Sequence, residues 1–397
     1  MSNDKCPHCG STNLGPGGCN NCGVGTLLPP PPPASTADTA GSGQIPPPSS
    51  TALSLLPAVI PAAAAGGEPT PKDFQDADRD LTNATTQEEK DKAWEVWENT
   101  LFNYRDRGYS LVTLIGLSGA GKTFYANRLR RELRLRKGWT VDPFEEDTIL
   151  QTDRKIECTQ IVRNGRRRRR RVLADCDGEA YREAIERLLK GEPVADLLRR
   201  YVMITSLASA YILMVPAPEQ RDKTKDLIER FGVIVSAILA LQLRLRETGN
   251  AKEVVRRGLT PEDLRLAKES EFTSERPVHV LFSQADRFQT LAPYTEDPLQ
   301  YAIARAPELV RTIDNHFTNY RFDFVSAFYG HPHTNGTKGA VPVDYSQPHY
   351  GVVPAFDWID TMIERPRFHK YDTRVAMSVR SLVDSAFRKT AKSKEVR

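Results

Sequence analysis

Residues 111–123, with the sequence LVTLIGLSGAGKT, constrain the fold of this 397-residue chain more than any other stretch. An apolar, partly β-branched run enters a glycine-rich loop, and a segment rich in Leu and Arg follows. This order predicts a strand, a loop and a helix. The glycines allow the backbone to wrap a polyphosphate, and the N–H groups at the start of the helix donate where the helix dipole favours negative charge. The stretch therefore predicts a phosphate-binding loop.

The side chains of this loop have separate expected roles. Lys122 would reach the β- and γ-phosphates of a nucleoside triphosphate, and the hydroxyl of Thr123 would bind Mg²⁺. The alternative is a glycine-rich turn that matches by chance, which the strand and helix patterns on either side argue against. The residues expected to bind the phosphates are Gly116, Ser118, Gly119, Ala120, Gly121, Lys122 and Thr123.

The composition is that of an ordinary globular protein, with 27% charged and 39% hydrophobic residues. The formal net charge of +4 says little about nucleic acid, so any such binding must depend on local patches. No signal peptide is visible, and the longest apolar stretches are too short or too interrupted to span a bilayer. We therefore expect a cytoplasmic protein without a transmembrane segment.

Four of the six cysteines lie close to the N-terminus, as two Cys-x-x-Cys pairs that are each followed by glycine. Two such turns direct four thiolates towards one tetrahedral Zn²⁺, and this usage indicates a reducing compartment. The pattern resembles the zinc ribbons fused to many bacterial proteins, and the alternative is two reactive dithiols without metal. The predicted zinc ligands are Cys6, Cys9, Cys19 and Cys22.

Changes in composition divide the rest of the chain. A segment rich in Pro and Ala follows the cysteines and cannot bury enough apolar surface to fold, so we expect a disordered, semi-rigid linker. Beyond it, Trp94, Trp97, Leu101 and Tyr104 recur at helical spacing, which predicts one amphipathic helix with both tryptophans in the core. The predicted parts are a zinc ribbon (1–26), a linker (27–72), a leading helix (73–109), an α/β domain (110–387) and a basic tail (388–397).

Residues 155–177 predict a β-hairpin after the helix that follows the phosphate loop. Asn164-Gly165 is a strong hairpin turn signal, and the returning strand passes through six arginines, 166–171. Alternation along a strand would place about three of them on each face. They either form a solvated edge or tip, or dock nucleic acid, anionic lipid or an acidic protein partner. The lack of interleaved aromatic residues weakens the case for single-stranded nucleic acid.

The second strand of this hairpin ends in Asp175-Cys176-Asp177-Gly178. A hairpin after the first helix whose returning strand delivers Asp-x-x-Gly resembles the Ras-like and translation-factor-like GTPases of the TRAFAC type. Kinases and many phosphate-loop ATPases lack it. The resemblance implies that Asp175 holds Mg²⁺ through water and that the N–H of Gly178 bonds the γ-phosphate.

The same resemblance assigns two further positions near the phosphates. A threonine that coordinates Mg²⁺ is expected before the hairpin, where Thr148 and Thr152 both qualify and Thr152 is preferred for its position. Glu179 stands where Ras-like proteins usually carry the glutamine that orients water. A carboxylate there adds negative charge near the phosphate, so slow intrinsic turnover is expected.

Two later segments resemble the base-reading motifs of GTPases. The strand at 277–286 ends in Ser283-Gln284-Ala285-Asp286, where the family has Asn/Thr-Lys-x-Asp. The resemblance implies that Asp286 accepts two hydrogen bonds from guanine, but Ser283 and Gln284 depart from the pattern and leave base selectivity open. The residues implied to meet guanine O6 through backbone N–H groups are Ser326 and Ala327.

A near-continuous apolar run at 208–215 predicts a parallel strand buried on both faces. The domain is thus expected to be α/β, with a mostly parallel central sheet flanked by helices. The resemblance implies a GTP-hydrolysing switch that uses Mg²⁺, with a structural Zn²⁺ in the ribbon. In architecture the chain is similar to the double-GTPase type of prokaryotic conflict or signalling systems, with a protein partner at the ribbon or arginine strand. The alternatives are a nucleotide-gated scaffold with little hydrolysis, or an ATPase.

Overall fold

The chain divides into two compact units, Met1–Ile60 and Pro61–Arg397. In the first unit, β1 (Leu14–Gly15) pairs antiparallel with β2 (Gly18–Cys19). The other three predicted zinc ligands lie outside the described residues, as do most of the linker and the basic tail, so the zinc ribbon stays a prediction. The computed structural model describes residues 14–15, 18–19, 70–142, 148–150, 156–165, 169–192, 198–216, 221–287, 297–328, 340–342 and 345–364.

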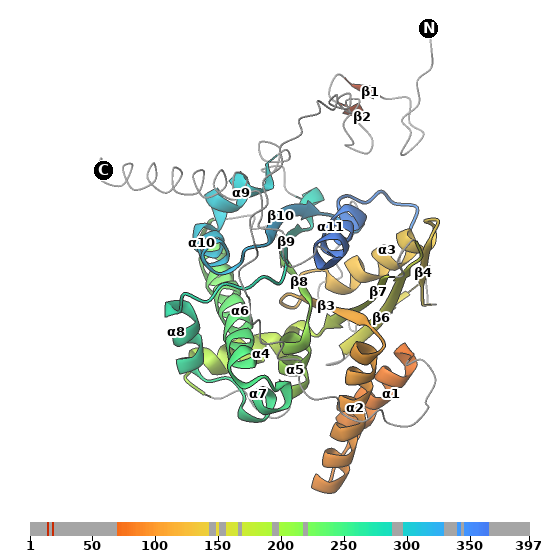
Figure 1. The fold of residues 1–397 in the computed structure, drawn as a ribbon. Coiled ribbons are helices and arrows are strands. Elements are labelled where there is room, and N and C mark those ends of the chain that lie inside the picture. Colours follow the sequence, from red (N-terminus) through yellow and green to blue (C-terminus); the bar gives the residue numbers. More distant parts are fainter. Residues whose placement is uncertain are drawn as a thin grey trace, which may run out of the picture. The chain divides into compact units, whose positions relative to one another are not determined.

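The second unit is built on a seven-stranded sheet with the order β10-β9-β8-β3-β7-β6-β4 (Figure 1). Strands β10, β9, β8, β3 and β7 are parallel, whereas β6 is antiparallel to β7 and β4 to β6. The predicted mostly parallel α/β sheet and the predicted hairpin are both confirmed. The strands are β3 (Tyr109–Ile115), β4 (Trp139–Val141), β6 (Ile156–Arg163), β7 (Arg169–Cys176), β8 (Ala210–Pro216), β9 (Val278–Ser283) and β10 (Tyr320–Val325), and β5 (Thr148–Leu150) pairs separately with β11 (Ala340–Pro342).

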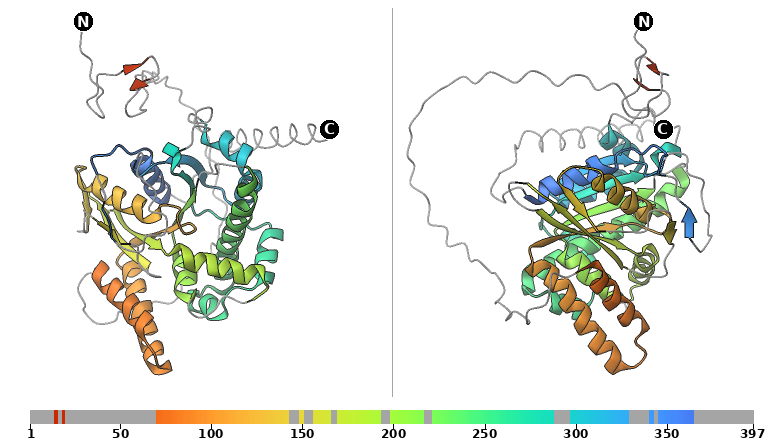
Figure 2. Two further views of the ribbon diagram at one scale, coloured as in Figure 1. Left: turned by 180° about the vertical axis from the view of Figure 1, so that it is seen from behind. Right: turned by 90° about the vertical axis from the view of Figure 1, so that its right-hand side faces the viewer.

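Helices cover both faces of this sheet (Figure 2). Alternate residues of β3 enter two apolar clusters: Val112 and Leu114 pack with α3 and α11, and Leu111 and Ile115 with the helices of the other face. In the part of the chain that the structure describes, no helix has both the length and the apolar character needed to cross a membrane. The helices are α1 (Pro71–Asn83), α2 (Gln87–Asp106), α3 (Lys122–Arg134), α4 (Gly178–Leu189), α5 (Arg199–Leu207), α6 (Arg221–Thr248), α7 (Ala251–Arg257), α8 (Pro261–Glu269), α9 (Pro298–Arg305), α10 (Pro307–His316) and α11 (Val352–Glu364).

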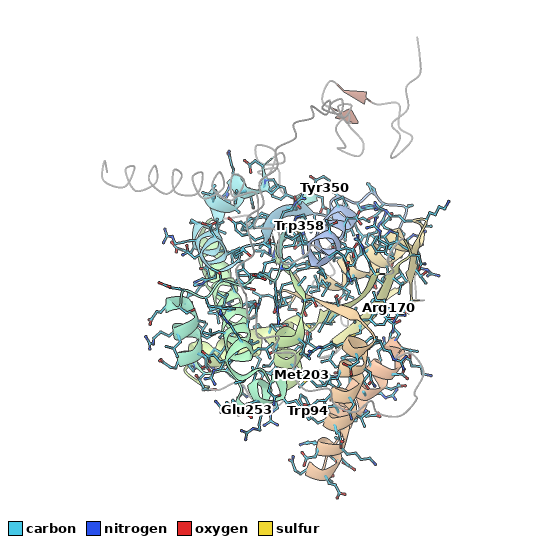
Figure 3. The ribbon with its side chains drawn as sticks, in the orientation of Figure 1. Trp94, Arg170, Met203, Glu253, Tyr350 and Trp358 are labelled. Carbon is cyan, nitrogen blue, oxygen red and sulfur yellow. The ribbon has the colours of Figure 1, made fainter. Side chains whose placement is uncertain are left out.

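The expected single helix before the domain is wrong, because the structure has two helices, α1 and α2, at this place. A second helix begins at Thr86, whose hydroxyl accepts from the N–H of Glu89 at 3.2 Å while the Glu89 carboxylate accepts from the N–H of Thr86 at 2.9 Å. This capping box outweighs the continuous apolar spacing. The expected core position is confirmed for Trp97, which is 0% exposed, and Trp94 stacks on it, partly buried (Figure 3).

A buried carboxylate, that of Asp78, ties these helices to the sheet. Its Oδ1 accepts from Trp97 Nε1 at 3.2 Å and from Arg200 Nη1 at 2.9 Å, and its Oδ2 accepts from the N–H of Ile156 at 3.4 Å. Burial raises the pKa of Asp78, and the Arg200 guanidinium opposes that shift. One side chain of α1 therefore connects α2, α5 and the first residue of β6.

We expect Asp78→Ala to lower the free energy of unfolding by about 3 to 5 kcal/mol, because it removes the carboxylate that compensates the buried charge of Arg200. Urea unfolding followed by tryptophan fluorescence measures the change. Asp76→Ala is the matched control on α1, since Asp76 pairs with Arg79 at the surface and such pairs contribute about 0 to 1 kcal/mol. Equal losses in the two variants would contradict the role given to Asp78.

Candidate functional site

The loop between β3 and α3 has the conformation that its sequence predicts. Gly119 and Gly121 have φ of 77° and 79°, in the left-handed region that favours glycine, and Gly121 directly precedes α3. A Cβ on Gly116 would lie 2.7 Å from the carbonyl oxygen of Met214 in β8, so a larger residue does not fit there. The loop therefore leaves the end of β3, turns tightly and enters the helix with its amide groups at the helix start.

Lys122, the first residue of α3, turns its ammonium back into this loop. Its Nζ donates to the carbonyl oxygens of Gly116 at 2.9 Å and Leu117 at 3.3 Å. Burial lowers the pKa of Lys122, and the nearby negative charge of Asp175 is the largest influence against that shift. A buried ammonium inside a loop of this kind is suited to neutralise phosphate charge.

Thr123 and Asp175 meet at the start of α3. The register of the parallel pair sets Leu114 of β3 beside Asp175 of β7, and the Thr123 hydroxyl donates to Asp175 Oδ2 at 2.8 Å. Oδ1 of Asp175 is buried and has no hydrogen-bond partner among the described residues. Burial raises the pKa of Asp175 to about 6. The second strand of the hairpin thus delivers its aspartate to the phosphate loop.

This pair of groups fits Mg²⁺, the ion that the resemblance implies. Mg²⁺ prefers carboxylate and hydroxyl oxygens and keeps several waters, and Asp175 offers a buried oxygen with no partner in the described structure. The described residues of the chain contain no group of three or more His, Cys, Asp or Glu side chains arranged to bind a metal ion. Thr123 and Asp175 could therefore hold the ion only together with phosphate oxygens and water.

Gly178 begins α4 directly against the loop. A Cβ at this residue would lie 2.4 Å from the backbone nitrogen of Ser118, so only glycine permits this close approach. Asp177 caps the helix by accepting from the N–H of Glu179 at 3.0 Å. The Glu179 side chain pairs with Arg182 one turn further along.

The expected base-reading residues lie at the ends of the neighbouring strands β9 and β10. Gln284 follows β9 with φ of 58°, and its Nε2 donates to the carbonyl oxygen of Gly119 in the phosphate loop at 2.8 Å. Asp286 lies in a 3₁₀ turn (Ala285–Arg287), where its Oδ1 accepts from the Ser326 hydroxyl at 2.6 Å. Ala327, the residue after Ser326, is partly buried and packs against the apolar cluster that contains α3.

Some expected residues are not placed, and some contacts were not expected. Thr152 lies outside the described residues, and of Thr148 only the backbone in β5 is described. Sequence reasoning treated Gln284 only as a departure from the family pattern and missed its bond to the loop. It also missed Arg182, although a Glu and an Arg three residues apart on a helix are a readable signal of an ion pair.

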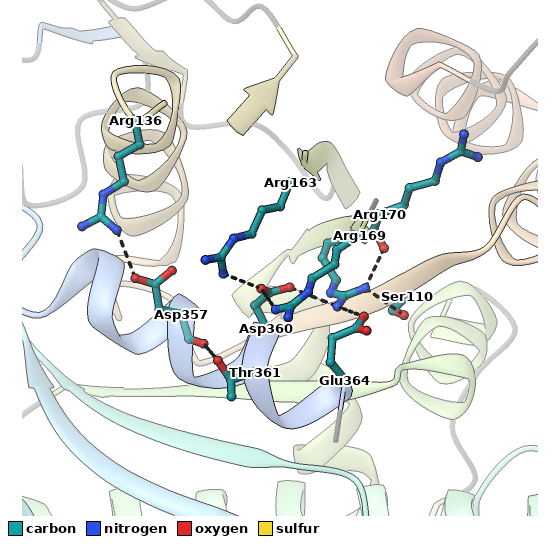
Figure 4. Close-up of polar contacts among 10 residues, drawn as sticks. Ser110, Arg136, Arg163, Arg169, Arg170, Asp357, Asp360, Thr361 and Glu364 are labelled. Atoms are coloured by element: carbon teal, nitrogen blue, oxygen red, sulfur yellow. Dashed lines mark hydrogen bonds and ion pairs between the residues drawn. The ribbon is translucent and has the colours of Figure 1, made fainter. Parts of the chain in front are cut away.

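Of the described arginines of the run, Arg171 is buried, whereas Arg169 and Arg170 are partly exposed, so the solvated-edge and docking interpretations both stay predictions. Arg169 of β7 and Arg163 of β6 form ion pairs with Asp360 of α11 at 2.8 and 3.2 Å (Figure 4). Arg171 of β7 pairs with the same carboxylate at 3.0 Å. Arg170 points to the other face, as strand alternation predicts, and donates to the carbonyl oxygen of Arg107 at 2.8 Å. Arg163, Arg169 and Arg171 fasten α11 to the sheet. Residues 166–168 lie outside the described structure.

A scan against protein-family models gives no match, and a search of curated proteins gives none either. Many solved structures match weakly, among them three that are each at 13% sequence identity. A signal recognition particle receptor complex from Chaetomium thermophilum matches 56% of this chain and 93% of its own, with a TM-score of 0.31. A GTP-binding protein from Sulfolobus solfataricus in complex with GDP matches 66% and 62%, with a TM-score of 0.28.

The third similar structure is the translation elongation factor SelB from Methanococcus maripaludis in complex with a GTP analogue, which matches 55% of this chain and 30% of its own, with a TM-score of 0.25. Similarity at these levels does not establish a family for the chain. The assignment of a function therefore rests on the geometry of the site itself.

Proposed function

We propose that this protein is a GTP-binding switch that depends on Mg²⁺ and hydrolyses GTP slowly. The observation that supports this most is the bond from Gln284 to Gly119, because it joins the segment that carries Asp286 to the phosphate loop. A phosphate loop after β3 and a base-reading aspartate after β9, two strands away in the same sheet, match a nucleotide that lies across the carboxyl edge of the sheet.

At the phosphate end of the site, each residue would bind or neutralise the negative charge of the phosphates. Lys122 and the loop N–H groups would bind the β- and γ-phosphates, and Thr123 and Asp175 would hold Mg²⁺ beside them. The ion, when bound, would draw charge from the phosphate oxygens. The N–H of Gly178, held against Ser118, would bond the γ-phosphate. When hydrolysis removes the γ-phosphate, α4 would lose this hydrogen bond.

At the base end, Asp286 would accept two N–H groups from guanine, a pair that adenine does not offer. Its carboxylate is oriented by the Ser326 hydroxyl, which donates to Oδ1. The N–H groups of Ser326 and Ala327 would meet guanine O6. Gln284 replaces the positively charged lysine of the family with a neutral amide, and it still connects this segment to the loop.

We extend the proposal to signalling or conflict systems because the sequence predicts a zinc ribbon and a proline-rich linker before the nucleotide domain. The ribbon, bound to structural Zn²⁺, would be the part that contacts a protein partner. The described arginines of β7 are engaged with Asp360 and Arg107, so the ribbon is the better candidate for that contact.

The assignment to GTP is tested by comparing GTP and ATP affinities. We expect Asp286→Ala to weaken GTP binding about 100-fold and leave ATP binding unchanged, because two hydrogen bonds to a charged acceptor are lost for guanine alone. Lys122→Ala should weaken both nucleotides, since it removes a phosphate contact. Titration with fluorescent nucleotides measures the dissociation constants, and the control is Lys190→Ala, which changes an exposed residue at the C-terminal end of α4. An unchanged preference in Asp286→Ala would remove Asp286 from the site.

The buried carboxylate of Asp175 gives a prediction about pH. Its pKa is about 6 in the folded chain against an ordinary value of 3.8, so ionisation at pH 7.5 costs the folded state about 3 kcal/mol. The cost shrinks as the pH falls through 6, because the folded chain then binds a proton that the unfolded chain does not. We expect Asp175→Asn to be more stable than the wild type by up to about 3 kcal/mol at pH 7.5 and by about half as much at pH 5.

Urea unfolding at several pH values, with EDTA and without nucleotide, measures this difference. The same variant should lose the Mg²⁺-dependent part of GTP binding, so stability rises while the proposed function falls. A wild-type protein more stable than Asp175→Asn at pH 7.5 would refute the raised pKa. Retained Mg²⁺-dependent binding in the variant would remove Asp175 from the ion site.

Slow hydrolysis follows from Glu179, whose carboxylate stands where a neutral glutamine is usual. We expect intrinsic turnover far below the 1 to 1,000 per second, roughly, of ordinary enzymes. Single-turnover release of phosphate from bound GTP measures the rate, with Lys122→Ala as the inactive control. A metabolic-enzyme rate without any partner would contradict the switch, and no release over hours would favour the scaffold alternative.

A further inference from the structure

The first turn of α4 brings a second carboxylate to the phosphate end of the site. Gly178 lies against Ser118 with no room for a Cβ, so the next residue, Glu179, starts beside the phosphate loop. The negative charge of Glu179 is among those that act on the buried ammonium of Lys122. Glu179 is therefore close enough for its charge to affect phosphates bound at Lys122.

Arg182 pairs with this carboxylate through two nitrogens. Its Nε donates to Glu179 Oε2 at 2.8 Å, and its Nη2 contacts the same oxygen. A weaker contact joins Nη1 to Glu186 at 3.5 Å. The planar guanidinium thus fixes the direction of the Glu179 side chain, which a single-point contact would not do.

The pairing leaves one carboxylate oxygen available. Both contacts of Arg182 go to Oε2, and within the described parts of the chain Oε1 of Glu179 makes no comparable contact. The two side chains remain 48% and 43% exposed, so water and nucleotide can reach them. An ion-paired carboxylate repels phosphate less than a lone one, and its other oxygen can still accept a hydrogen bond from water.

We propose that Arg182 is a positioning residue for hydrolysis: it holds the Glu179 carboxylate and offsets its charge, so that Oε1 can orient the attacking water. This inference rests on the proposed GTPase function. In this inference, the arginine that offsets the negative charge of Glu179 comes from this chain and not from a partner protein. The competing interpretation is a pair of exposed helix residues that contributes only to local helix stability.

A double-mutant cycle on turnover at saturating GTP tests the inference. We expect Arg182→Ala to lower the turnover about 10- to 100-fold with unchanged GTP affinity, because the carboxylate loses its fixed direction and its counter-charge. In the Glu179→Gln background the same substitution should have no effect, since a neutral amide needs no counter-charge. Arg182→Lys should restore part of the rate, because it keeps the charge but loses the two-nitrogen contact.

Arg187→Ala is the matched control. Arg187 forms an ion pair with Glu183 at 3.4 Å on the same helix, α4, but Glu183 does not adjoin the phosphate loop. Binding of GDP with aluminium fluoride adds a readout that does not need turnover. It should weaken in Arg182→Ala and stay unchanged in Arg187→Ala.

Three results would overturn the inference: an unchanged turnover in Arg182→Ala, the same loss in the Glu179→Gln background, or an equal loss in Arg187→Ala. Failure of the proposed function itself looks different. In that case the wild type neither binds GTP through Lys122 nor releases phosphate, whatever residue stands at 182.

Discussion

Parallel pairing of β3 with β7 is the constraint on which the candidate site depends. Parallel strands end at the same edge of a sheet, so the residues after β3 and at the end of β7 must come together there. The register of this pair brings Asp175 to the Thr123 hydroxyl at 2.8 Å. Because β8, β9 and β10 continue the parallel order, Gln284 and Ser326 reach the same edge, with Gln284 bonded to the phosphate loop.

Local patterns allowed much of this to be predicted, because their physical causes lie within a few residues. The phosphate loop, the Asn164-Gly165 hairpin and the apolar strand at 208–215 each depend on near neighbours in the sequence, and the structure contains all three. The helix break at Thr86 was also a local signal, Thr followed by Glu at the third position. It was missed because the apolar spacing from Trp94 to Tyr104 was extended back through the whole helix-permissive segment, 73–107.

Contacts between distant segments could not be predicted in the same way. Asp360 neutralises arginines of the hairpin from α11, and Asp78 meets Arg200 in a helix beyond the phosphate loop and the hairpin. An arginine run is equally compatible with solvent, nucleic acid or an internal acidic partner until the partner is placed. The resemblance to GTPases predicted the order of the motifs along the chain but not these ion pairs. It also did not predict the hydrogen bond from Gln284 to the phosphate loop.

The two buried charges of the site, at Lys122 and Asp175, are arranged as the proposed nucleotide and Mg²⁺ would require. Lys122 satisfies its ammonium with two loop carbonyls, and Asp175 keeps one buried oxygen without a partner in the described structure. Burial disfavours the charged form of both groups: it lowers the pKa of Lys122 and raises the pKa of Asp175. Phosphate oxygens at Lys122 and a cation at Asp175 would offset both costs at once. Under the proposed function, ligand binding would therefore relieve the unfavourable burial of both charges.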